Sequence, residues 1–471
     1  MVENPGTELG VTKISAMNLR NTRITSILLC ILIIISSCSV QKKIGKVADR
    51  IIIHNNILSN AHIGMSIYDP GDGTFLYNYQ SNKYFVPASN TKIFSCYAGL
   101  QNLGDSLPGI RYIENDTAVF LFPTGDPTLL HKDFVHHPVI DFLRSAKKNI
   151  YITDQYWKSE PLGSGWSWND YNENYMVERS PLPIYGNLIT WVQERTAEKN
   201  MDSMAFDQSL AIYSLPEVNW KVRFNTDLTK KSFYVQRAKN ENIFQITEGT
   251  ENKKEQEVPF VANGLQSALD LLKDTIYKEV SLTTSPFSNH GLDKTQTRTI
   301  FSQPTDSVLK IMMHRSDNFF AEQILLMSSN EKFTVLDDDS IIRNLLNNSL
   351  KDLQQKPRWV DGSGLSRYNL FTPESFVSIL NKMKSEFTIE RIKAIFPTPG
   401  VGTLESYPKT DSGYLFAKTG TLSGIVALSG FLYTRKNKLL IFSILVNNHR
   451  TTAAEVRKNI QLFLATIRNR F

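Results

Sequence analysis

Three short motifs follow one another along the chain, and their order and spacing restrict the folds that can bring them together. They are Ser89-Asn90-Thr91-Lys92, Ser316-Asp317-Asn318 and Lys418-Thr419-Gly420. Together they supply a hydroxyl nucleophile, two lysines that can manage its proton and a strand edge that can hold a peptide-like substrate. Each motif alone is weak evidence, because the Ser-x-x-Lys spacing also occurs at Ser145 and Lys148. The prediction therefore depends on the complete set.

The residues around Ser89 predict a loop that enters a buried helix. Pro87 and Ala88 precede Ser89. An apolar run follows it, at Ile93, Phe94, Tyr97 and Leu100. Lys92 then lies one turn further on the same face of the helix, within reach of the Ser89 hydroxyl. In the alternative interpretation Ser89 only caps the helix and Lys92 is solvated.

A serine nucleophile needs a base, and Lys92 is the candidate. The hydroxyl is a poor nucleophile at neutral pH unless a neighbouring group takes its proton. Lys92 can do so only when neutral, so its pKa must be lowered by burial or by a second cation, for which Lys418 is the candidate. This Ser-Lys chemistry is an alternative to a histidine triad. We therefore interpret His314, just before the second motif, as a helix-end residue rather than a catalyst.

The second motif connects two predicted helices. Apolar stripes precede and follow it, and Ser316 and Asn318 lie two residues apart in the connection, so both can point into one cleft. Ser316 could relay a proton to a leaving amine. Asn318 could bind Lys92 and a substrate amide. Without the other two motifs, Ser-Asp-Asn would be a common helix-capping composition.

The third motif lies in a predicted strand, residues 414–421. A turn follows at Ser423-Gly424, and then two β-rich runs at residues 425–434 and 438–447. This pattern predicts an antiparallel meander. We expect a first helix over residues 44–58, strands over 62–69 and 73–79, and a last helix over about 452–468 to pack with the same sheet.

This strand is also the predicted substrate edge. Lys418 would project into the cleft and attract a substrate carboxylate. Gly420 would let a ligand backbone approach closely, and Thr419 and Thr421 flank it as further substrate-binding residues. The backbone N–H groups of Ser89 and Thr421 could form an oxyanion hole.

With these motifs, the chain resembles the penicillin-binding protein 4 type of D-alanyl-D-alanine carboxypeptidase/endopeptidase. The matching segments are residues 87–92, Gly125-Asp126-Pro127-Thr128-Leu129, residues 316–322, Asp361-Gly362-Ser363-Gly364-Leu365-Ser366-Arg367 with Asn369-Leu370, and residues 418–421. The resemblance implies an α+β fold of the transpeptidase/β-lactamase type, an antiparallel sheet flanked by helices. It also implies an acyl-enzyme on Ser89, peptidoglycan peptides and β-lactams as ligands, and no cofactor.

The spacing of the first two motifs predicts a large insertion, because 227 residues separate Ser89 from Ser316. We expect an export signal and N-terminal extension over residues 1–37 and the first part of the catalytic domain over 38–104. An inserted subdomain follows over 105–285, and the second part of the catalytic domain over 286–471. The insertion carries an aromatic cluster, Trp157, Trp166, Trp168 and Tyr171. These rings could stack on sugars, but we expect them to pack in the core.

The N-terminus predicts export. Arg20 and Arg23 precede an apolar run, residues 24–35, which ends in Ile35-Ser36-Ser37-Cys38. This ending resembles a bacterial lipoprotein box, in which Cys38 is lipidated and anchors the chain to a membrane facing the periplasm. Ser39, which is not acidic, favours the outer membrane by analogy. The alternatives are an ordinary cleaved signal and an uncleaved anchor.

Composition is consistent with an exported globular enzyme. The 471 residues are 41% hydrophobic and 21% charged, with a net charge of +6 and no basic block of the kind that binds nucleic acid. Cys96 would be a buried, inert thiol, and metal-ligand spacing is absent. Two other functions stay open: a β-lactamase or esterase with the same nucleophile, and a non-catalytic wall-binding protein.

Overall fold

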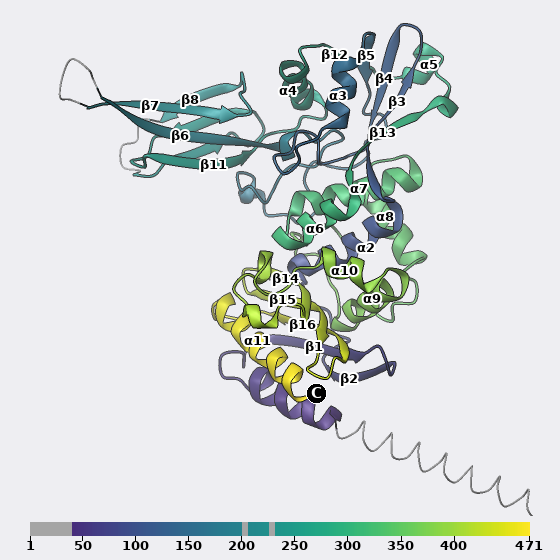
Figure 1. Cartoon of the computed structure of the whole chain (residues 1–471), viewed down its shortest axis with the longest axis vertical. Helices are drawn as coiled ribbons and strands as arrows, with labels where there is room; N and C mark the ends of the chain where they lie inside the picture. The colour runs from purple at the N-terminus through teal and green to yellow at the C-terminus, as the bar shows by residue number, and fades with distance from the viewer. Residues whose placement is uncertain (1–39, 200–205, 226–230) are drawn as a thin grey trace, which may run out of the picture.

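The computed structural model describes residues 40–199, 206–225 and 231–471. Two units are stacked along the long axis of the molecule, a lower unit built from both ends of the chain and an upper unit built from its middle (Figure 1). The predicted export signal and Cys38 lie outside the described residues. Among the helices of the described ranges, none combines the length and the apolar character needed to span a membrane.

The lower unit contains the predicted antiparallel sheet. Its strand order is β14-β15-β16-β1-β2, and each neighbouring pair is antiparallel. The strands are β1 (His62–Asp69), β2 (Thr74–Tyr79), β14 (Leu415–Leu422), β15 (Ile425–Tyr433) and β16 (Leu439–Asn447). The chain's first strands thus pair with its last ones, and the meander that contains the third motif is confirmed.

Helices cover both faces of this sheet, which explains its apolar strands. Val426 and Leu428 share a core with the N-terminal helix, residues 40–48, and with α11 (Ala453–Arg470). Ala427 and Phe431 point the other way, into a core with α2 (Lys92–Asn102) and α9 (Pro373–Glu386). A strand buried on both faces reads as a continuous apolar run rather than an alternating one.

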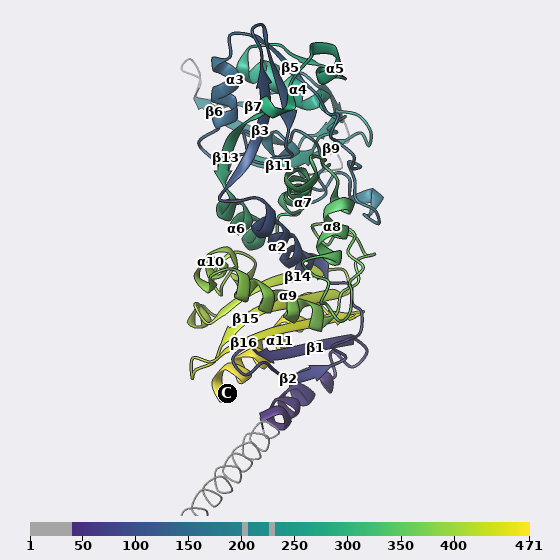
Figure 2. The ribbon, with the colours of Figure 1, turned by 90° about the vertical axis from the view of Figure 1, so that its right-hand side faces the viewer.

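A layer of helices lies between the lower sheet and the upper unit (Figure 2). Besides α2 and α9 it contains α6 (Thr305–Arg315), α7 (Asn318–Phe333), α8 (Asp338–Asn347) and α10 (Ile389–Ile395). Residues 319–330 of α7 are buried on every side of the helix, as expected for a helix inside a large core. This layer carries the first two motifs.

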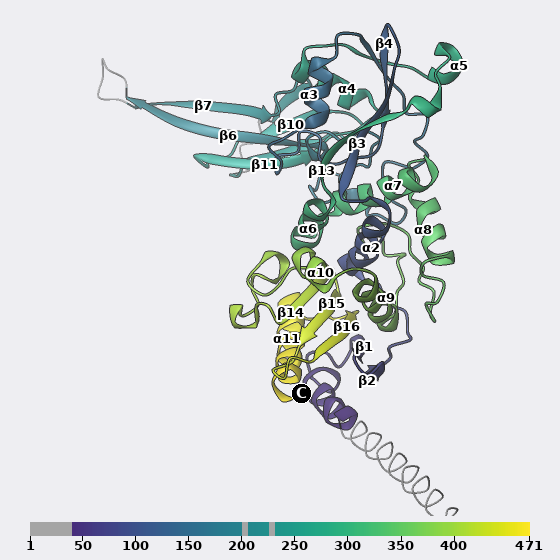
Figure 3. The same ribbon diagram turned by 45° about the vertical axis from the view of Figure 1, so that its right-hand side comes forward.

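In its described residues, the upper unit contains three sheets. One has the order β12-β5-β4-β3-β13, a second β11-β6-β7 and a third β8-β10-β9. Their strands are β3 (Ser106–Glu114), β4 (Ala118–Pro123), β5 (Asn149–Ile152), β6 (Leu188–Lys199), β7 (Phe206–Leu215), β8 (Lys221–Asn225), β9 (Tyr234–Arg237), β10 (Ile243–Thr247), β11 (Lys253–Pro259), β12 (Val280–Leu282) and β13 (Arg298–Pro304). The helices are α3 (Pro138–Ser145), α4 (Gln266–Ile276) and α5 (Pro286–His290). Strands β6 and β7 project to one side (Figure 3).

The upper unit continues beyond the predicted end of the insertion at residue 285. Strand β13 pairs with β3 along an edge of the five-stranded sheet. Phe287, in α5, packs on Phe122 of β4 with ring centroids 5.4 Å apart. A boundary at residue 285 would divide this unit, so we propose that the insertion runs from residue 105 to Pro304.

Candidate active site

Ser89 lies in a tight turn that precedes α2. The turn is a 3-10 helix, Ala88–Thr91, and Ala88 has a φ of 49°, a left-handed value that is rare outside glycine. Thr91, not Ser89, is the N-cap residue of α2. The alternative in which Ser89 only caps the helix therefore does not describe this turn, and strained backbone of this kind is frequent at functional sites.

Lys92 is fully buried and points at the nucleophile. Its Nζ donates to Ser89 Oγ at 3.1 Å, to Asn318 Oδ1 at 2.6 Å and to the carbonyl oxygen of Ser363 at 2.7 Å. Burial lowers the pKa of Lys92 to about 8, although Asp361 and other nearby carboxylates oppose the shift. A lysine with such a pKa is partly neutral near physiological pH.

The second motif lies between α6 and α7, as predicted. Ser316 ends α6 with a φ of 61°, and the Asp317 side chain caps α7 by accepting the Phe320 N–H at 3.0 Å. Asn318 is the first residue of α7, and its Nδ2 donates to the carbonyl of Tyr175 at 2.9 Å. In this motif Asp317 caps the helix, while Ser316 and Asn318 face the cleft.

Lys418, on β14, is also fully buried. Its Nζ donates to Ser316 Oγ and to the Thr419 carbonyl, both at 2.8 Å. Burial lowers the pKa of Lys418 well below its usual value, and the Lys92 ammonium adds to the shift. The sequence predicts that Lys418 lowers the pKa of Lys92. In the structure it is the Lys92 ammonium that lowers the pKa of Lys418.

Gly420 lies against the nucleophile turn. A Cβ at this position would lie 2.6 Å from the Pro87 carbonyl and 3.1 Å from the backbone nitrogens of Ser89 and Asn90. The glycine therefore lets β14 lie directly against the nucleophile turn. The turn and the strand edge are held together by this close packing.

The motifs meet at a cleft of about 710 Å³. Ser89, Ser316, Asn318 and Thr421 line it, whereas both lysines lie behind this surface. Of the three residues predicted to bind substrate, only Thr421 is part of the lining. The other lining residues are Gly165, Trp166, Ser167, Asp170, Tyr175, Met176, Gly364, Leu365, Arg367, Leu422 and Ser423. The inserted segment thus forms one wall of the cleft.

A family model decides where this chain belongs. Residues 46–468 match the model of the D-Ala-D-Ala carboxypeptidase 3 (S13) family. The chain belongs to this family. It is therefore a serine hydrolase, and the predicted resemblance to the penicillin-binding protein 4 type is confirmed.

Individual S13 relatives are distant in sequence but similar over most of their length. A D-alanyl-D-alanine carboxypeptidase of Actinomadura sp. (strain R39) is 26% identical over 84% of this chain and 80% of its own length. A D-alanyl-D-alanine carboxypeptidase DacB of Haemophilus influenzae is 22% identical over 83% and 86%. The crystal structure of penicillin binding protein 4 from Haemophilus influenzae superposes with a TM-score of 0.67 at 18% identity, covering 90% of this chain and 98% of that one. The predicted fold is therefore confirmed.

Several residues of the S13 site had no role predicted from the sequence. The Ser363 carbonyl that binds Lys92 belongs to a loop ordered by Asp361. The Asp361 carboxylate accepts the Gly364 N–H at 2.8 Å, the Ser366 N–H at 2.7 Å and the Trp166 indole N–H at 2.9 Å. The segment 361–367 was matched only by resemblance, since its partners lie far away in sequence.

The predicted aromatic cluster does not pack in the core of this S13 enzyme. Trp168 is 70% exposed and Trp166 is half-buried at the cleft, where the Arg179 guanidinium lies over its ring at 5.8 Å. His314 is in the last turn of α6 and Cys96 is buried, as predicted. Across the described residues, no group of three His, Cys, Asp or Glu side chains is placed to hold a metal ion.

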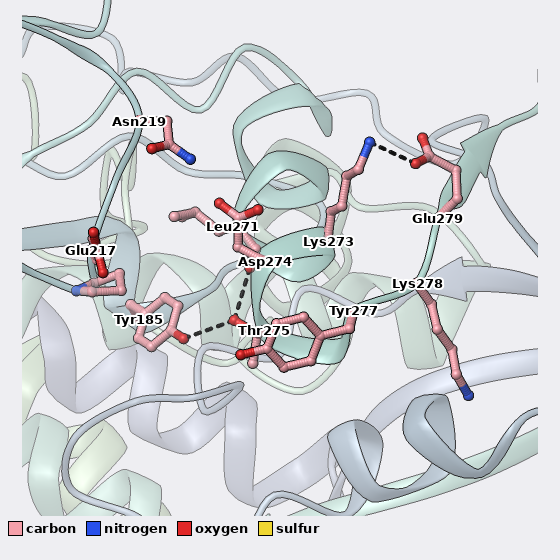
Figure 4. Close-up of a pocket in the computed structure, with 11 residues that line it drawn as sticks. Tyr185, Glu217, Asn219, Leu271, Lys273, Asp274, Thr275, Tyr277, Lys278 and Glu279 are labelled. Atoms are coloured by element: carbon pink, nitrogen blue, oxygen red, sulfur yellow. Dashed lines mark hydrogen bonds and ion pairs between the residues drawn. The ribbon is translucent and has the colours of Figure 1, made fainter.

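A second pocket, of about 680 Å³, lies on the upper unit beside α4 (Figure 4). It contains none of the motif residues, and its charged side chains are solvent-exposed except for the half-buried Lys278. Lys273 pairs with Glu279 at 2.8 Å, and Tyr185 shares a hydrogen bond with Thr275 at 3.0 Å (Figure 4). This pocket lacks the buried polar groups that distinguish the cleft.

Proposed function

We propose that this S13 enzyme hydrolyses D-alanyl-D-alanine bonds of peptidoglycan peptides through an acyl-enzyme on Ser89, and that penicillin acylates the same serine. The observation that carries the proposal is the contact of the buried Lys92 amine with Ser89 Oγ at 3.1 Å. A lysine with a lowered pKa, beside a hydroxyl and oriented by an amide, is the arrangement that an activated serine requires.

The reaction proceeds in two steps. Ser89 Oγ attacks the carbonyl carbon of the scissile bond while Lys92 takes the hydroxyl proton, and the backbone N–H groups of Ser89 and Thr421 stabilise the oxyanion. The C–N bond then breaks as Ser316, beside Lys418, relays to the leaving amine the proton that Lys92 took from Ser89, so that Lys92 is neutral again. In the second step water gives a proton to Lys92 as it attacks the ester carbonyl, and that proton returns to Ser89 Oγ as the shortened peptide leaves as a carboxylic acid.

Lys418 is proposed to bind the substrate's terminal carboxylate. In the free cleft, burial and the Lys92 charge both disfavour its protonation. An arriving carboxylate would favour the charged form of Lys418, because an opposite charge within about 4–6 Å raises a lysine pKa. The substrate carboxylate would then pair with the Lys418 ammonium.

Carboxypeptidase and endopeptidase activity need the same machinery, and we propose both. Incubation of the purified enzyme with cross-linked muropeptides, followed by mass analysis, tests this. Loss of a terminal D-alanine and separation of the cross-linked dimer are the expected products. Penicillin labelling without any peptide product would favour a β-lactamase or esterase, and no labelling at all would overturn the proposed acylation of Ser89 by penicillin.

We also propose that the protein is exported and anchored through lipidated Cys38. The support is the sequence motif that ends at Cys38. Two residues further on, Val40 packs against the core that contains α11. Several acyl chains anchor stably whereas one binds only marginally. Membrane fractionation of a Cys38→Ser variant tests the anchor, which is refuted if the variant and the native chain pellet equally.

A further inference from the structure

Glu322 is a buried acid that the proposed reaction does not use. It lies one turn after Asn318 on α7, with 1% of its surface exposed. Its Oε1 accepts the backbone N–H of Ser363 at 2.7 Å. The carbonyl of the same Ser363 accepts the Lys92 ammonium at 2.7 Å. One backbone unit therefore links the Glu322 carboxylate to the candidate base.

This link is held on two sides, so a shift of Glu322 would reach Lys92. A Cβ on Gly362 would lie 2.4 Å from the Ala321 carbonyl, which means that the loop lies directly on α7. From the other side, Ser95 on α2 donates its hydroxyl to the Gly362 carbonyl at 2.6 Å. Closely packed interiors of this kind transmit displacements rather than absorbing them.

Glu322 belongs to a buried charge cluster that spans both units. Arg179, from the insertion, lies 3.5 Å from its Oε2 and binds Asp338 of α8 at 2.5 Å. Burial raises the pKa of Glu322 to about 7; Asp361 adds to the shift and Arg179 opposes it. Arg179 thus favours the negatively charged form of a carboxylate that burial disfavours.

The carboxylates around Lys92 favour its protonated form. Burial lowers the pKa of Lys92, and Asp361, Glu322 and Asp317 raise it again, in that order. For Lys418, burial and the Lys92 ammonium both lower the pKa. Removing the Glu322 charge should therefore let Lys92 release its proton at a lower pH.

We propose that Glu322 is a positioning residue for Lys92: it fixes the Ser363 carbonyl on which the lysine amine rests, and it places a carboxylate charge on the same side of the cleft. The inference rests on the proposed role of Lys92 as the base that activates Ser89. Arg179 connects this control to the insertion, because it stabilises the charged form of Glu322.

The test is the pH dependence of acylation by penicillin, measured on the full chain by stopped-flow. In the native enzyme the rate should rise with pH as Lys92 becomes neutral. Glu322→Gln keeps an oxygen acceptor for the Ser363 N–H but removes the charge. The rising limb of the pH–rate profile, where Lys92 loses its proton, should then move to lower pH by about half a unit to one unit. A merely structural role of Glu322 would leave the limb in place.

Two further variants separate charge from position. Glu322→Asp keeps the charge but shortens the side chain, so the limb should stay while the plateau rate falls on the order of 10- to 100-fold. Glu331→Gln is the matched control, because it removes the same charge from the same helix at a residue that pairs with Arg111 instead. Its limb and its plateau should equal those of the native enzyme.

The outcomes distinguish this inference from the proposed function. Thermal melting must first show that each variant is folded at the assay temperature. An unshifted limb in folded Glu322→Gln overturns the electrostatic role, and a native plateau in Glu322→Asp overturns the positioning role. If Glu322→Gln does not fold, Glu322→Asp still decides the positioning role. If penicillin fails to acylate Ser89 in the native enzyme, the proposed function itself is wrong.

Discussion

The two buried lysines of the cleft have similar burial and opposite surroundings. On the nucleophile side, Lys92 donates to a hydroxyl, an amide oxygen and a carbonyl, within the field of several carboxylates. On the strand side, Lys418 donates only to Ser316 and to the carbonyl of the adjoining Thr419 among the described residues. Burial lowers the pKa of both, but only the first has nearby carboxylates that oppose the shift.

This difference suggests a division of labour. Buried charge is tolerated when it is paired, and it is costly otherwise. The protein itself supplies negative charge beside Lys92, whereas the strand side leaves that partner to the substrate. We therefore interpret Lys92 as the group that exchanges a proton with Ser89, and Lys418 as the group that a terminal carboxylate engages.

The insertion contributes to the nucleophile side in particular. Trp166 donates to Asp361, Arg179 approaches Glu322, and the Tyr175 carbonyl accepts from Asn318. The insertion therefore does more than line the cleft, because it binds residues that surround the nucleophile. Excising it would remove the partners of a buried acid, and a buried charge left without its partner is strongly destabilising.

The largest expected effect is at the nucleophile, which both sides of the cleft serve. Ser89→Ala should abolish the covalent penicillin adduct, because no oxygen remains to form the ester. Intact-protein mass spectrometry, with peptide mapping of the native adduct, is the measurement. An adduct that persists in the variant, or maps to another serine, would remove the basis of the comparison.

Next in size is the loss of the base. Lys92→Ala should slow acylation by about two to four orders of magnitude, the typical contribution of a general base. In the native enzyme the rate should rise with pH through about 8, because Lys92 is active only after it loses its proton. Stopped-flow acylation across pH checks both points, and a rate in the variant within a factor of about three of the native rate would contradict the assignment.

A smaller effect on stability and acylation is expected at Gly420, where β14 touches the nucleophile turn. Gly420→Ala would place a Cβ 2.6 Å from the Pro87 carbonyl, so β14 must move away from the nucleophile turn. Overpacking of this kind typically costs about 1–3 kcal/mol of stability, and acylation should slow as well. Gly45→Ala is the control, because its Cβ would meet Tyr77 at an ordinary 3.6 Å. Denaturant unfolding and penicillin acylation of both variants measure the difference, and equal behaviour would contradict the close-packing account.

The sequence predicted the parts of the site that depend on local pattern. Three patterns each involve only residues that are close together in the chain. They are the apolar run after Ser89, the capping composition at Asp317 and the succession of β-rich runs and a turn around Lys418. These patterns placed the helix, the connection and the strand within a few residues of their observed bounds.

The rest of the site depends on contacts between distant segments. Glu322 and Ser363, or Trp166 and Asp361, come together only in the folded chain, and nothing in their local sequence marks a buried acid. Gly420 shows the same limit, because its partner is a turn far earlier in the chain. The proposed extension of the insertion to Pro304 rests on a contact of the same kind, the pairing of β13 with β3.

The division of labour between the lysines is tested most directly by acylation rates for matched peptides that end in D-Ala-D-Ala or in its C-terminal amide. The native enzyme should be slower with the amide, on the order of 10- to 100-fold, the loss expected when a charged group loses its buried partner. In Lys418→Ala the two peptides should react at the same rate. In Lys92→Ala both rates should be much lower, but the amide should still be slower than the free acid by the same factor. A penalty that survives in Lys418→Ala, or vanishes in Lys92→Ala, would contradict the account.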